Sequence, residues 1–343
     1  MIITKGRFKL WQKVLLWLLI ALLSLFSSLL MWGWLTMIFM PGKSYAGELQ
    51  PLSNQEQLLQ SQLRQDVEKI AGKIGEHNYR NHDNLVAVAQ YLEQSFNQMG
   101  YQVNSQIYEV NGQLFRNLEV EIPGKERAKE IVVIGAHYDS VINSPGANDN
   151  GTGVAAVLAL ARAFANQSTG RTLRFVEFVN EEQPFAHTEN MGSFVYAKGC
   201  FDRGEKVVAM LSLETIGYYS REPGSQRYPM GLLEKIYPIT GDFIAFVGNL
   251  NSRQLVRQVV GSFRRHGQFP SQGATLPNSS SAAGRSDHWS FWQHGYPGLM
   301  VTDTAPFRYP YYHTAQDTPD KIDYESFARV VVGLEGVVKD LSK

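Results

Sequence analysis

The hydrophobic pattern divides the chain into two kinds of segment. Residues 14–40 contain no charged side chain. At about 1.5 Å per residue, a helix of this length can cross a hydrocarbon core of roughly 30 Å. From residue 52 onward, apolar and polar positions recur with the periods of amphipathic helices and of strands. The pattern therefore predicts one long apolar helix followed by a folded domain.

The folded part begins with helical and hairpin patterns and continues with alternating strands and helices. Residues 52–100 predict helical structure that stops at Gly100, and the stretches 101–110 and 115–124 alternate like paired strands. Strands are then predicted at 131–140, 172–182, 207–217, 242–250 and 295–303, and helices at 151–165, 189–200, 251–265 and 324–341. This order predicts the α/β class: a single three-layer α/β/α domain with a central, mostly parallel mixed sheet.

These patterns also set the domain boundaries. We predict a basic tip at residues 1–13, a transmembrane anchor at 14–40, a linker at 41–51 and one α/β domain at 52–343. Within that domain, residues 267–284 are rich in Ser, Gly and Pro, which predicts a surface loop. No internal repeat interrupts the domain. The motifs are spread across the whole predicted sheet, which favours one domain over two.

The charge distribution predicts how the chain lies in a membrane. The 32 basic and 32 acidic residues cancel, so no overall field favours a nucleic-acid partner. Basic side chains gather before the apolar span, at Lys5, Arg7, Lys9 and Lys13, which favours a cytoplasmic N-terminus and an extracytoplasmic domain. Residues 44–46 have the small-x-small pattern of a signal-peptidase site. However, the apolar core of a signal peptide usually runs only about 7–15 residues, so we favour a retained single-pass anchor in the lipid bilayer.

Composition excludes several other classes. Hydrophobic residues make up 44% of the chain, as in a folded protein with a substantial core. The single cysteine, Cys200, excludes an intrachain disulfide framework and any multi-cysteine metal site. Nothing in the composition indicates the oligomeric state.

Polar side chains follow the predicted strands, where ligands gather in open α/β sheets. Each of these residues alone has an ordinary structural reading, but together they form a donor set. They are His137, Asp139, Asp149, Glu181, Glu182, Glu214 and His313. Two histidines and three carboxylates without cysteine suit two divalent ions such as zinc, cobalt or manganese, with one carboxylate bridging both. One further glutamate would stay free as a base.

The motifs around these residues resemble those of the M28 family of metallopeptidases over roughly residues 85–340. They are His-x-Asp at 137–139, GANDNGTG at 146–153, NEE at 180–182, the acid at 214, SDH at 286–288 and YHTAQDT at 312–318. The resemblance implies that His137 and Glu214 bind one ion, that Glu182 and His313 bind the other, and that Asp149 bridges them.

The resemblance also implies roles for three further side chains. Glu181 would be the general base, Asp139 would orient His137, and Tyr312 would donate a hydrogen bond to the tetrahedral oxyanion. Ser286-Asp287-His288 would shape the pocket, because three consecutive residues do not line up as a nucleophilic triad.

Two features depart from the family pattern. The family often has Asp at the position of Glu214, and residues 183–190 differ from the shorter glycine-rich link of relatives. His187 or Glu189 in this segment would then line the rim of the site.

The resulting hypothesis is a membrane-anchored, zinc-dependent exopeptidase of the aminopeptidase type that hydrolyses the N-terminal bond of peptides or proteins through a water held between two metal ions. Three alternatives stay open: a glutaminyl cyclase-like acyltransferase with one zinc, a catalytically silent binding ectodomain, and a carboxypeptidase in which Arg285 or Arg308 holds the substrate carboxylate.

Overall fold

The computed structural model describes residues 10–278, 280 and 283–343. Lys5, Arg7 and Lys9 of the predicted basic tip lie outside the described residues. The chain forms two compact units, one that ends at Phe39 and one that spans Met40–Lys343.

The first unit is one apolar helix. It comprises α1 (Leu10–Gly33) and a π-helical turn, η1 (Trp34–Ile38). The whole helix, Leu10–Ile38, has 29 residues, and no residue of α1 is buried against protein. Its length and composition suit a membrane span, although a signal sequence near the N-terminus has the same properties. The helix begins four residues before the predicted span and ends two residues before its predicted end.

The second unit is built on an eight-stranded mixed sheet with the order β1-β2-β4-β3-β5-β8-β6-β7. Its central strands β4, β3, β5 and β8 run parallel, whereas β1, β2 and the β6–β8 pair contribute antiparallel ladders. The strands are β1 (Asn104–Val110), β2 (Gln113–Ile122), β3 (Arg127–His137), β4 (Arg171–Phe178), β5 (Lys206–Glu214), β6 (Ile244–Asn249), β7 (Ser271–Leu276) and β8 (Gly298–Thr302).

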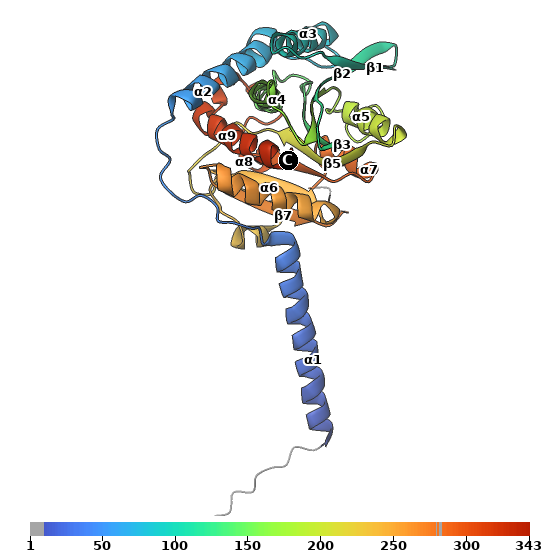
Figure 1. The fold of residues 1–343 in the computed structure, drawn as a ribbon. Helices are drawn as coiled ribbons and strands as arrows, with labels where there is room; N and C mark the ends of the chain where they lie inside the picture. The colour runs from blue at the N-terminus through green and yellow to red at the C-terminus, as the bar shows by residue number, and fades with distance from the viewer. Residues whose placement is uncertain (1–9, 279, 281–282) are drawn as a thin grey trace, which may run out of the picture. The chain divides into compact units, whose positions relative to one another are not determined.

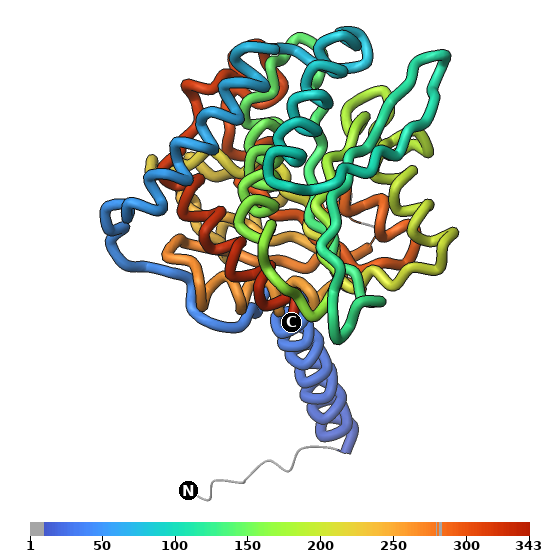
Figure 2. The backbone as a smooth tube through the Cα atoms, turned by 45° about the horizontal axis from the view of Figure 1, so that its top comes forward, coloured from blue at the N-terminus to red at the C-terminus, as the bar shows by residue number. Residues whose placement is uncertain are grey.

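Helices cover both faces of this sheet, as predicted. A large apolar cluster packs one face against α2 (Asn54–Val67), α3 (His82–Gln98), α4 (Gly151–Phe164), α6 (Arg253–His266) and α9 (Tyr324–Leu341). A smaller cluster packs the other face against α5 (Gly192–Asp202) and α7 (His288–Gln293). Figures 1 and 2 show α2 in blue beside α9 in red, although the two helices lie far apart in the sequence. Shorter elements are η2 (Glu68–Ile74), η3 (Gly231–Lys235), η4 (Leu250–Ser252), α8 (Ala305–Arg308) and η5 (Pro319–Lys321).

The sequence of α4 explains why this helix lies close under the sheet. Asn150 caps its N-terminus by accepting from the N–H of Gly153. A Cβ atom at Gly153 would lie 2.3 Å from the carbonyl oxygen of Leu213, so only glycine permits this approach. Nearly every residue of the helix is buried. The end of α4 that follows Asp149 is therefore fixed against β5.

Two sequence predictions need correction. Residues 267–284 are not all loop, because β7 lies within them and pairs with β6 in parallel. The small residues that suggested a loop are needed for packing, since a Cβ atom on Gly273 would lie 2.8 Å from Cγ of Met40. The helical stretch 52–100 is also interrupted between Gly75 and Asn81, and α7 was not predicted.

The chain before α2 covers the β7 edge of the sheet. The N–H of Ser271 donates to Oγ of Ser44 at 2.8 Å. Arg264 donates to the carbonyl oxygens of Met40, Pro41 and Gly42 at 3.3, 3.2 and 3.0 Å. Residues 40–44 thus pack on the folded unit; the prediction placed Met40 at the end of the anchor and residues 41–51 in a linker.

Candidate metal centre

The parallel strands bring the predicted donors to one edge of the sheet. His137 and Glu214 are the last residues of β3 and β5. Glu181 and Glu182 follow β4, and Asp149 lies just before α4. His313 comes from the segment after β8 and α8. Since β4, β3 and β5 are neighbours in the sheet, side chains far apart in the sequence meet where these strands end.

The donor atoms form two groups of three that share Asp149. In the first, Nε2 of His137 lies 3.4 Å from Oδ1 of Asp149 and 3.3 Å from Oε2 of Glu214. In the second, Nε2 of His313 lies 3.0 Å from Oδ2 of Asp149 and 3.4 Å from Oε1 of Glu182. Within each group, the three donor atoms all lie within 4.8 Å of one another.

The chemistry of these atoms fits divalent cations. Nε2 of His137, both carboxylate oxygens of Asp149 and Oε1 of Glu182 are buried and have no hydrogen-bond partner among the described residues. Burying such groups without a partner is costly, and a cation would remove that cost. Imidazole nitrogen and carboxylate oxygen are ligands that zinc and similar ions accept.

Asp139 holds the segment that carries the two glutamates. Its carboxylate accepts the backbone N–H groups of Glu181 and Glu182 at 3.0 and 3.1 Å. Nδ1 of His137 lies 3.0 Å from the carbonyl oxygen of Asp139 and 3.6 Å from its Oδ1. One aspartate therefore touches both the histidine and the backbone of the Glu181–Glu182 pair.

A second aspartate, Asp317, holds Asp149 in the same manner. Its two carboxylate oxygens accept the N–H groups of Asn148 at 2.8 Å and of Asp149 at 3.1 Å. Oδ1 also accepts from the hydroxyl of Tyr309 at 2.8 Å. Asp317 lies in the YHTAQDT motif, but the motif alone assigned it no role. The backbone N–H groups that it accepts from, those of Asn148 and Asp149, lie about 170 residues away, and no local signal marks them.

Ser286 contacts the remaining acidic donor. Its hydroxyl donates to Oε2 of Glu214 at 2.6 Å and lies 2.8 Å from the hydroxyl of Ser212. His288 does not face Ser286, because its Nε2 lies 2.6 Å from the carbonyl oxygen of Ala283. The Ser-Asp-His sequence is therefore not arranged as a catalytic triad.

Comparison with known proteins identifies the family. The model of Peptidase family M28 matches residues 117–335, which is more than half of the chain. The chain belongs to peptidase family M28. It is thus a hydrolase of the metallopeptidase type, as its motifs suggested.

Curated relatives of this M28 chain include aminopeptidases. The uncharacterized protein YfbL of Escherichia coli K12 is 35% identical over 281 residues, which cover 80% of this chain and 85% of YfbL. A probable leucine aminopeptidase 1 of Trichophyton verrucosum is 27% identical over 238 residues, 65% of this chain. The matched residues make up only 57% of that longer protein.

Solved structures of similar fold include a zinc aminopeptidase and a glutaminyl cyclase. LapB from Legionella pneumophila has a TM-score of 0.66 at 20% identity, with 88% of this chain and 78% of LapB covered. BSAP, a zinc aminopeptidase from Bacillus subtilis, has a TM-score of 0.66 at 14% identity, with coverage of 83% and 95%. The glutaminyl cyclase of Fimbriiglobus ruber has a TM-score of 0.61 at 19% identity, with coverage of 86% and 97%.

Electrostatics in the M28 site favour protons on Glu181, Glu182 and His313 when no cation is bound. Burial opposes ionisation of Asp149, but His137 and His313 lower its pKa. Burial raises the pKa of Glu181 well above the usual carboxyl value; His137 opposes this shift and Glu182 adds to it. Burial and the charge of Asp149 raise the pKa of Glu182 to about 7. Burial opposes the charged form of His313, but the adjacent carboxylates of Asp149 and Glu182 raise its pKa to about 10. Cations and protons therefore compete for these donors.

Tyr312 lies beside the donor groups. Its ring stacks on the imidazole of His313, with 3.8 Å between ring centroids and 20° between planes. Burial raises the pKa of Tyr312 far above its usual value, and the negative charges of Asp149 and Glu214 add to this shift. The hydroxyl thus keeps its proton over the whole physiological range and can donate a hydrogen bond.

The predicted rim residue His187 and the two arginines considered for a substrate carboxylate have partners within the protein. His187 lies with Nε2 2.7 Å from the carbonyl oxygen of Gly284 and packs on the ring of Trp289. Arg308 is buried and donates to Gln226 and to the carbonyl oxygen of Phe243, each at 2.8 Å. Its guanidinium is therefore not presented to a substrate carboxylate. Arg285 lies over the ring of Phe307.

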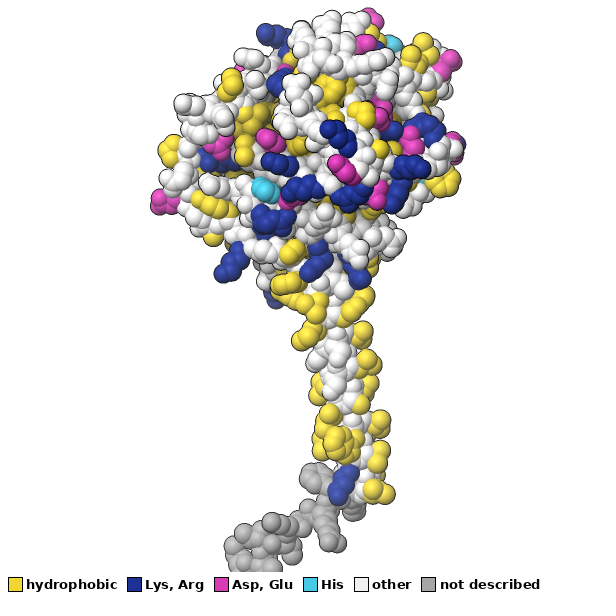
Figure 3. Space-filling model, in the orientation of Figure 1, with side chains coloured by type: hydrophobic (Ala, Val, Ile, Leu, Met, Phe, Trp, Pro, Cys, Tyr) yellow, Lys and Arg dark blue, Asp and Glu magenta, His cyan; other side chains and the backbone are white. Residues whose placement is uncertain are grey.

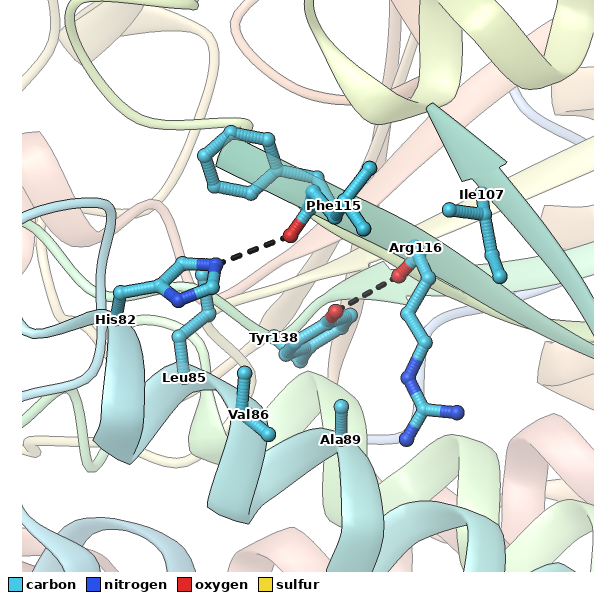
Figure 4. A pocket seen from close by; sticks show the side chains of 9 residues that line it. His82, Leu85, Val86, Ala89, Ile107, Phe115, Arg116 and Tyr138 are labelled. Atoms are coloured by element: carbon cyan, nitrogen blue, oxygen red, sulfur yellow. Dashed lines mark hydrogen bonds between the residues drawn. The ribbon is translucent and has the colours of Figure 1, made fainter. Parts of the chain in front are cut away.

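An apolar pocket of about 340 Å³ lies between α3 and the β1–β2 hairpin. Figure 4 shows the ring of Tyr138 at this pocket, with its hydroxyl donating to the carbonyl oxygen of Arg116 at 2.7 Å. Nε2 of His82 lies 3.0 Å from the carbonyl oxygen of Leu114. None of the candidate metal donors lines the pocket. Tyr138 instead ties the end of β3, which carries His137, to strand β2.

Proposed function

We propose that this M28 protein is a membrane-anchored aminopeptidase that uses two divalent ions, with zinc favoured. The observation that carries the proposal is the pair of donor groups that share Asp149, while Glu181 belongs to neither group. In the proposed arrangement, His137 and Glu214 hold one ion, Glu182 and His313 hold the other, and Asp149 contacts both.

The protein's own residues supply the remaining chemistry. Two bound ions would lower the pKa of a water molecule and polarise the scissile carbonyl group of the substrate. Glu181 has an oxygen 4.0 Å from Nε2 of His137 and would lie within reach of a water activated by those ions. Its carboxylate takes a proton as the water oxygen bonds to the carbonyl carbon. It returns the proton to the amine nitrogen as the carbon–nitrogen bond breaks. The products are a free amino acid and the shortened peptide with a new amino group.

Tyr312 completes the proposed machinery. Its protonated hydroxyl would donate a hydrogen bond to the oxygen that becomes negative in the tetrahedral intermediate. Asp139 and Asp317 would keep the acidic donors in place through their backbone N–H groups. These two aspartates are positioning residues, since neither needs to touch the substrate.

The proposed substrates are peptides or proteins with a free N-terminus. The Trichophyton verrucosum relative is named a probable leucine aminopeptidase, and BSAP is described as a zinc aminopeptidase. A free α-amino group is positively charged, and the site is rich in buried carboxylates that would attract it. Carboxypeptidase action is less well supported, because Arg308 is occupied by protein partners.

We propose that the apolar helix is kept as an anchor, with residues 1–13 in the cytoplasm and the catalytic domain outside. Met40 is only 6% exposed and packs on Gly273, and Ser44 bonds to the β7 edge. Cleavage after Ala46 would remove both contacts and expose strand β7. The catalytic domain, predicted as 52–343, would therefore be stabilised by residues from Met40 onward.

Replacement of Glu181 tests the proposed mechanism. Glu181→Gln keeps the size of the side chain but removes the base, so kcat for aminoacyl-anilide hydrolysis should fall at least a hundredfold while zinc content is unchanged. Glu335→Gln, at an exposed position of α9 outside both donor groups, is the matched control and should behave like wild type. Unchanged hydrolysis by Glu181→Gln with full zinc content would rule out the assigned role.

A second candidate function is glutaminyl cyclisation, because glutaminyl cyclases share the fold. Both donor groups are complete here, which favours two ions over one. Zinc analysis and a substrate with N-terminal glutamine separate the two functions. One tightly bound zinc per chain with pyroglutamate as the product would favour the cyclase, and rapid hydrolysis of N-acetylated peptides would exclude an aminopeptidase.

A further inference from the structure

An exposed apolar loop lies between β5 and β6, outside the metal centre. Residues 228–239 include the turn η3 and carry Met230, Leu232 and Ile239, which are 57%, 66% and 48% exposed. Large apolar side chains gathered on an exposed loop mark an interaction surface more often than isolated ones do. We call residues 228–239 the apolar loop.

The apolar loop is ordered by its own polar contacts. The hydroxyl of Tyr228 donates to the carbonyl oxygen of Pro238 at 2.7 Å, and its ring stacks on that of Tyr237. The N–H of Gln226 donates to the carbonyl oxygen of Ile239 at 3.1 Å, so the two ends of the loop are closed. The exposed apolar side chains thus belong to a loop that has hydrogen bonds and ring packing of its own.

The apolar loop lies next to the residues that follow the apolar helix. The hydroxyl of Tyr237 donates to the carbonyl oxygen of Gly273 at 3.1 Å. Gly273 is also the residue against which Met40 packs, and Met40 follows the helix end at Ile38 after a single residue. Figure 1 shows the gold segment that contains η3 at the same edge of the folded unit as β7.

Basic side chains accompany the apolar ones. Arg227 and Lys235 are exposed in or beside the loop, and Lys43 is exposed in the segment that follows the helix. One acid, Glu234, lies among them. Figure 3 shows dark blue and yellow side chains interspersed at this end of the folded unit. Apolar side chains flanked by lysine and arginine are typical of surfaces that enter the headgroup region of a bilayer.

We propose that the apolar loop inserts into the bilayer that holds the apolar helix. Tyr237 of the loop and Met40 each contact Gly273, and Met40 is two residues beyond the helix end, so the membrane that would hold the proposed anchor is within reach of the loop. This inference rests on the proposed anchor. The catalytic unit would then have two attachments to one membrane, a spanning helix and an interfacial loop, which restrict its rotation.

Site-directed spin labelling of the full chain in lipid nanodiscs tests the proposal. The native cysteine, Cys200, is buried, so single cysteines introduced by Leu232→Cys, Ile107→Cys and Leu22→Cys can be labelled selectively. Ile107 is the matched control: it is 62% exposed and lies on β1, at the opposite edge of the sheet from β7. Leu22 lies within the apolar helix and reports whether that helix is in the membrane.

Collisions with oxygen and with a water-soluble nickel chelate give the readout. A lipid-exposed label at 232 should show at least a tenfold higher ratio of oxygen to nickel accessibility than the label at 107. An embedded label at 22 with a water-exposed label at 232 would overturn the loop proposal and leave the anchor intact. Water exposure at both 22 and 232 would overturn the anchor and the loop proposal with it. Poor access of both reagents to 232 would indicate a protein partner and also reject the bilayer.

Substitution provides a second, independent measurement. In this experiment the spin label is attached through Lys235→Cys. The triple variant Met230→Ser, Leu232→Ser, Ile239→Ser should lower the ratio of oxygen to nickel accessibility at this label by about tenfold. Hydrolysis of a soluble anilide substrate should be unchanged, since the loop contains none of the proposed metal donors. An unchanged contrast at 235 would mean that these side chains do not hold the loop in lipid.

Discussion

Asp317→Asn tests whether the bridging donor is held in place by its backbone. The buried carboxylate accepts from two consecutive N–H groups, those of Asn148 and Asp149, and from the hydroxyl of Tyr309. Asparagine has the same size but only one oxygen, so its amide N–H₂ must face an N–H or hydroxyl donor. One hydrogen bond to a charged group is lost, which costs about 1.5–3 kcal/mol.

Two consequences follow for the variant. Its Tm should fall by several degrees, as expected for a loss of this size in a large domain. Zinc affinity should fall about 10–100-fold, because residues that position ligands commonly contribute that much. Both ions should be affected, since Asp149 belongs to both donor groups. Competition with a chelator of known affinity measures the zinc affinity, and calorimetry measures Tm.

Asp323→Asn is the matched control. Asp323 caps α9 by accepting from the N–H of Ser326, and asparagine caps helices about as well. This variant should keep wild-type zinc affinity and nearly wild-type Tm. Asp317→Asn with a lowered Tm but unchanged zinc affinity would contradict the positioning role and leave only a structural one.

Three further predictions concern the metal centre and the fold. Ser286→Ala removes the hydrogen bond to Glu214 and should weaken the zinc ion proposed for the His137–Glu214 group about tenfold in a chelator titration, and unchanged affinity for both ions would contradict this. Free zinc at a hundred times its Kd should add about 2.7 kcal/mol to the free energy of unfolding. Removal of zinc should therefore lower Tm, and re-added zinc or cobalt should restore it. Burial opposes ionisation of Glu205, but hydrogen bonds from Arg174 and Arg203 hold its pKa at about 2, below the ordinary value of 4.5. The stability from this pair is therefore present above pH 4.5 and lost as the pH falls toward 2, so the stability gap between wild type and Glu205→Gln should close over that range in denaturant titrations.

The sequence predicted the fold class and the elements that carry the donors, because these signals are local. The apolar run of strand β3 ends at His137, and the apolar run of helix α4 begins just after Asp149, so these polar residues stand out from the patterns beside them. Strand β7 was missed because its buried positions are small. Only the packing of Met40 on Gly273 shows why glycine is required there.

The polar residues around the donors were predictable only in part. Asp139 was expected to orient His137, and the structure places its carboxylate on the N–H groups of the Glu181–Glu182 segment as well. Asp317 and the contact of Ser286 with Glu214 depend on contacts between distant parts of the chain. No sequence pattern contains such contacts. The assignment of the donors to metal ions remains a prediction for the zinc measurements above.

The attachment of residues 40–44 to the folded unit also limits where the enzyme can work. Only Phe39 separates the helix end at Ile38 from the packed Met40, so the connection between the two units is about one residue long, or roughly 3.5 Å. With the helix in the membrane, the catalytic unit cannot extend toward substrates in the way that a domain on a long flexible linker can. If the helix is retained as the proposed anchor, substrates would have to come to the membrane surface. The rate of cleavage in cells would then depend on substrate concentration in that thin layer, and insertion of a flexible spacer after Phe39 would widen the range of accessible peptides.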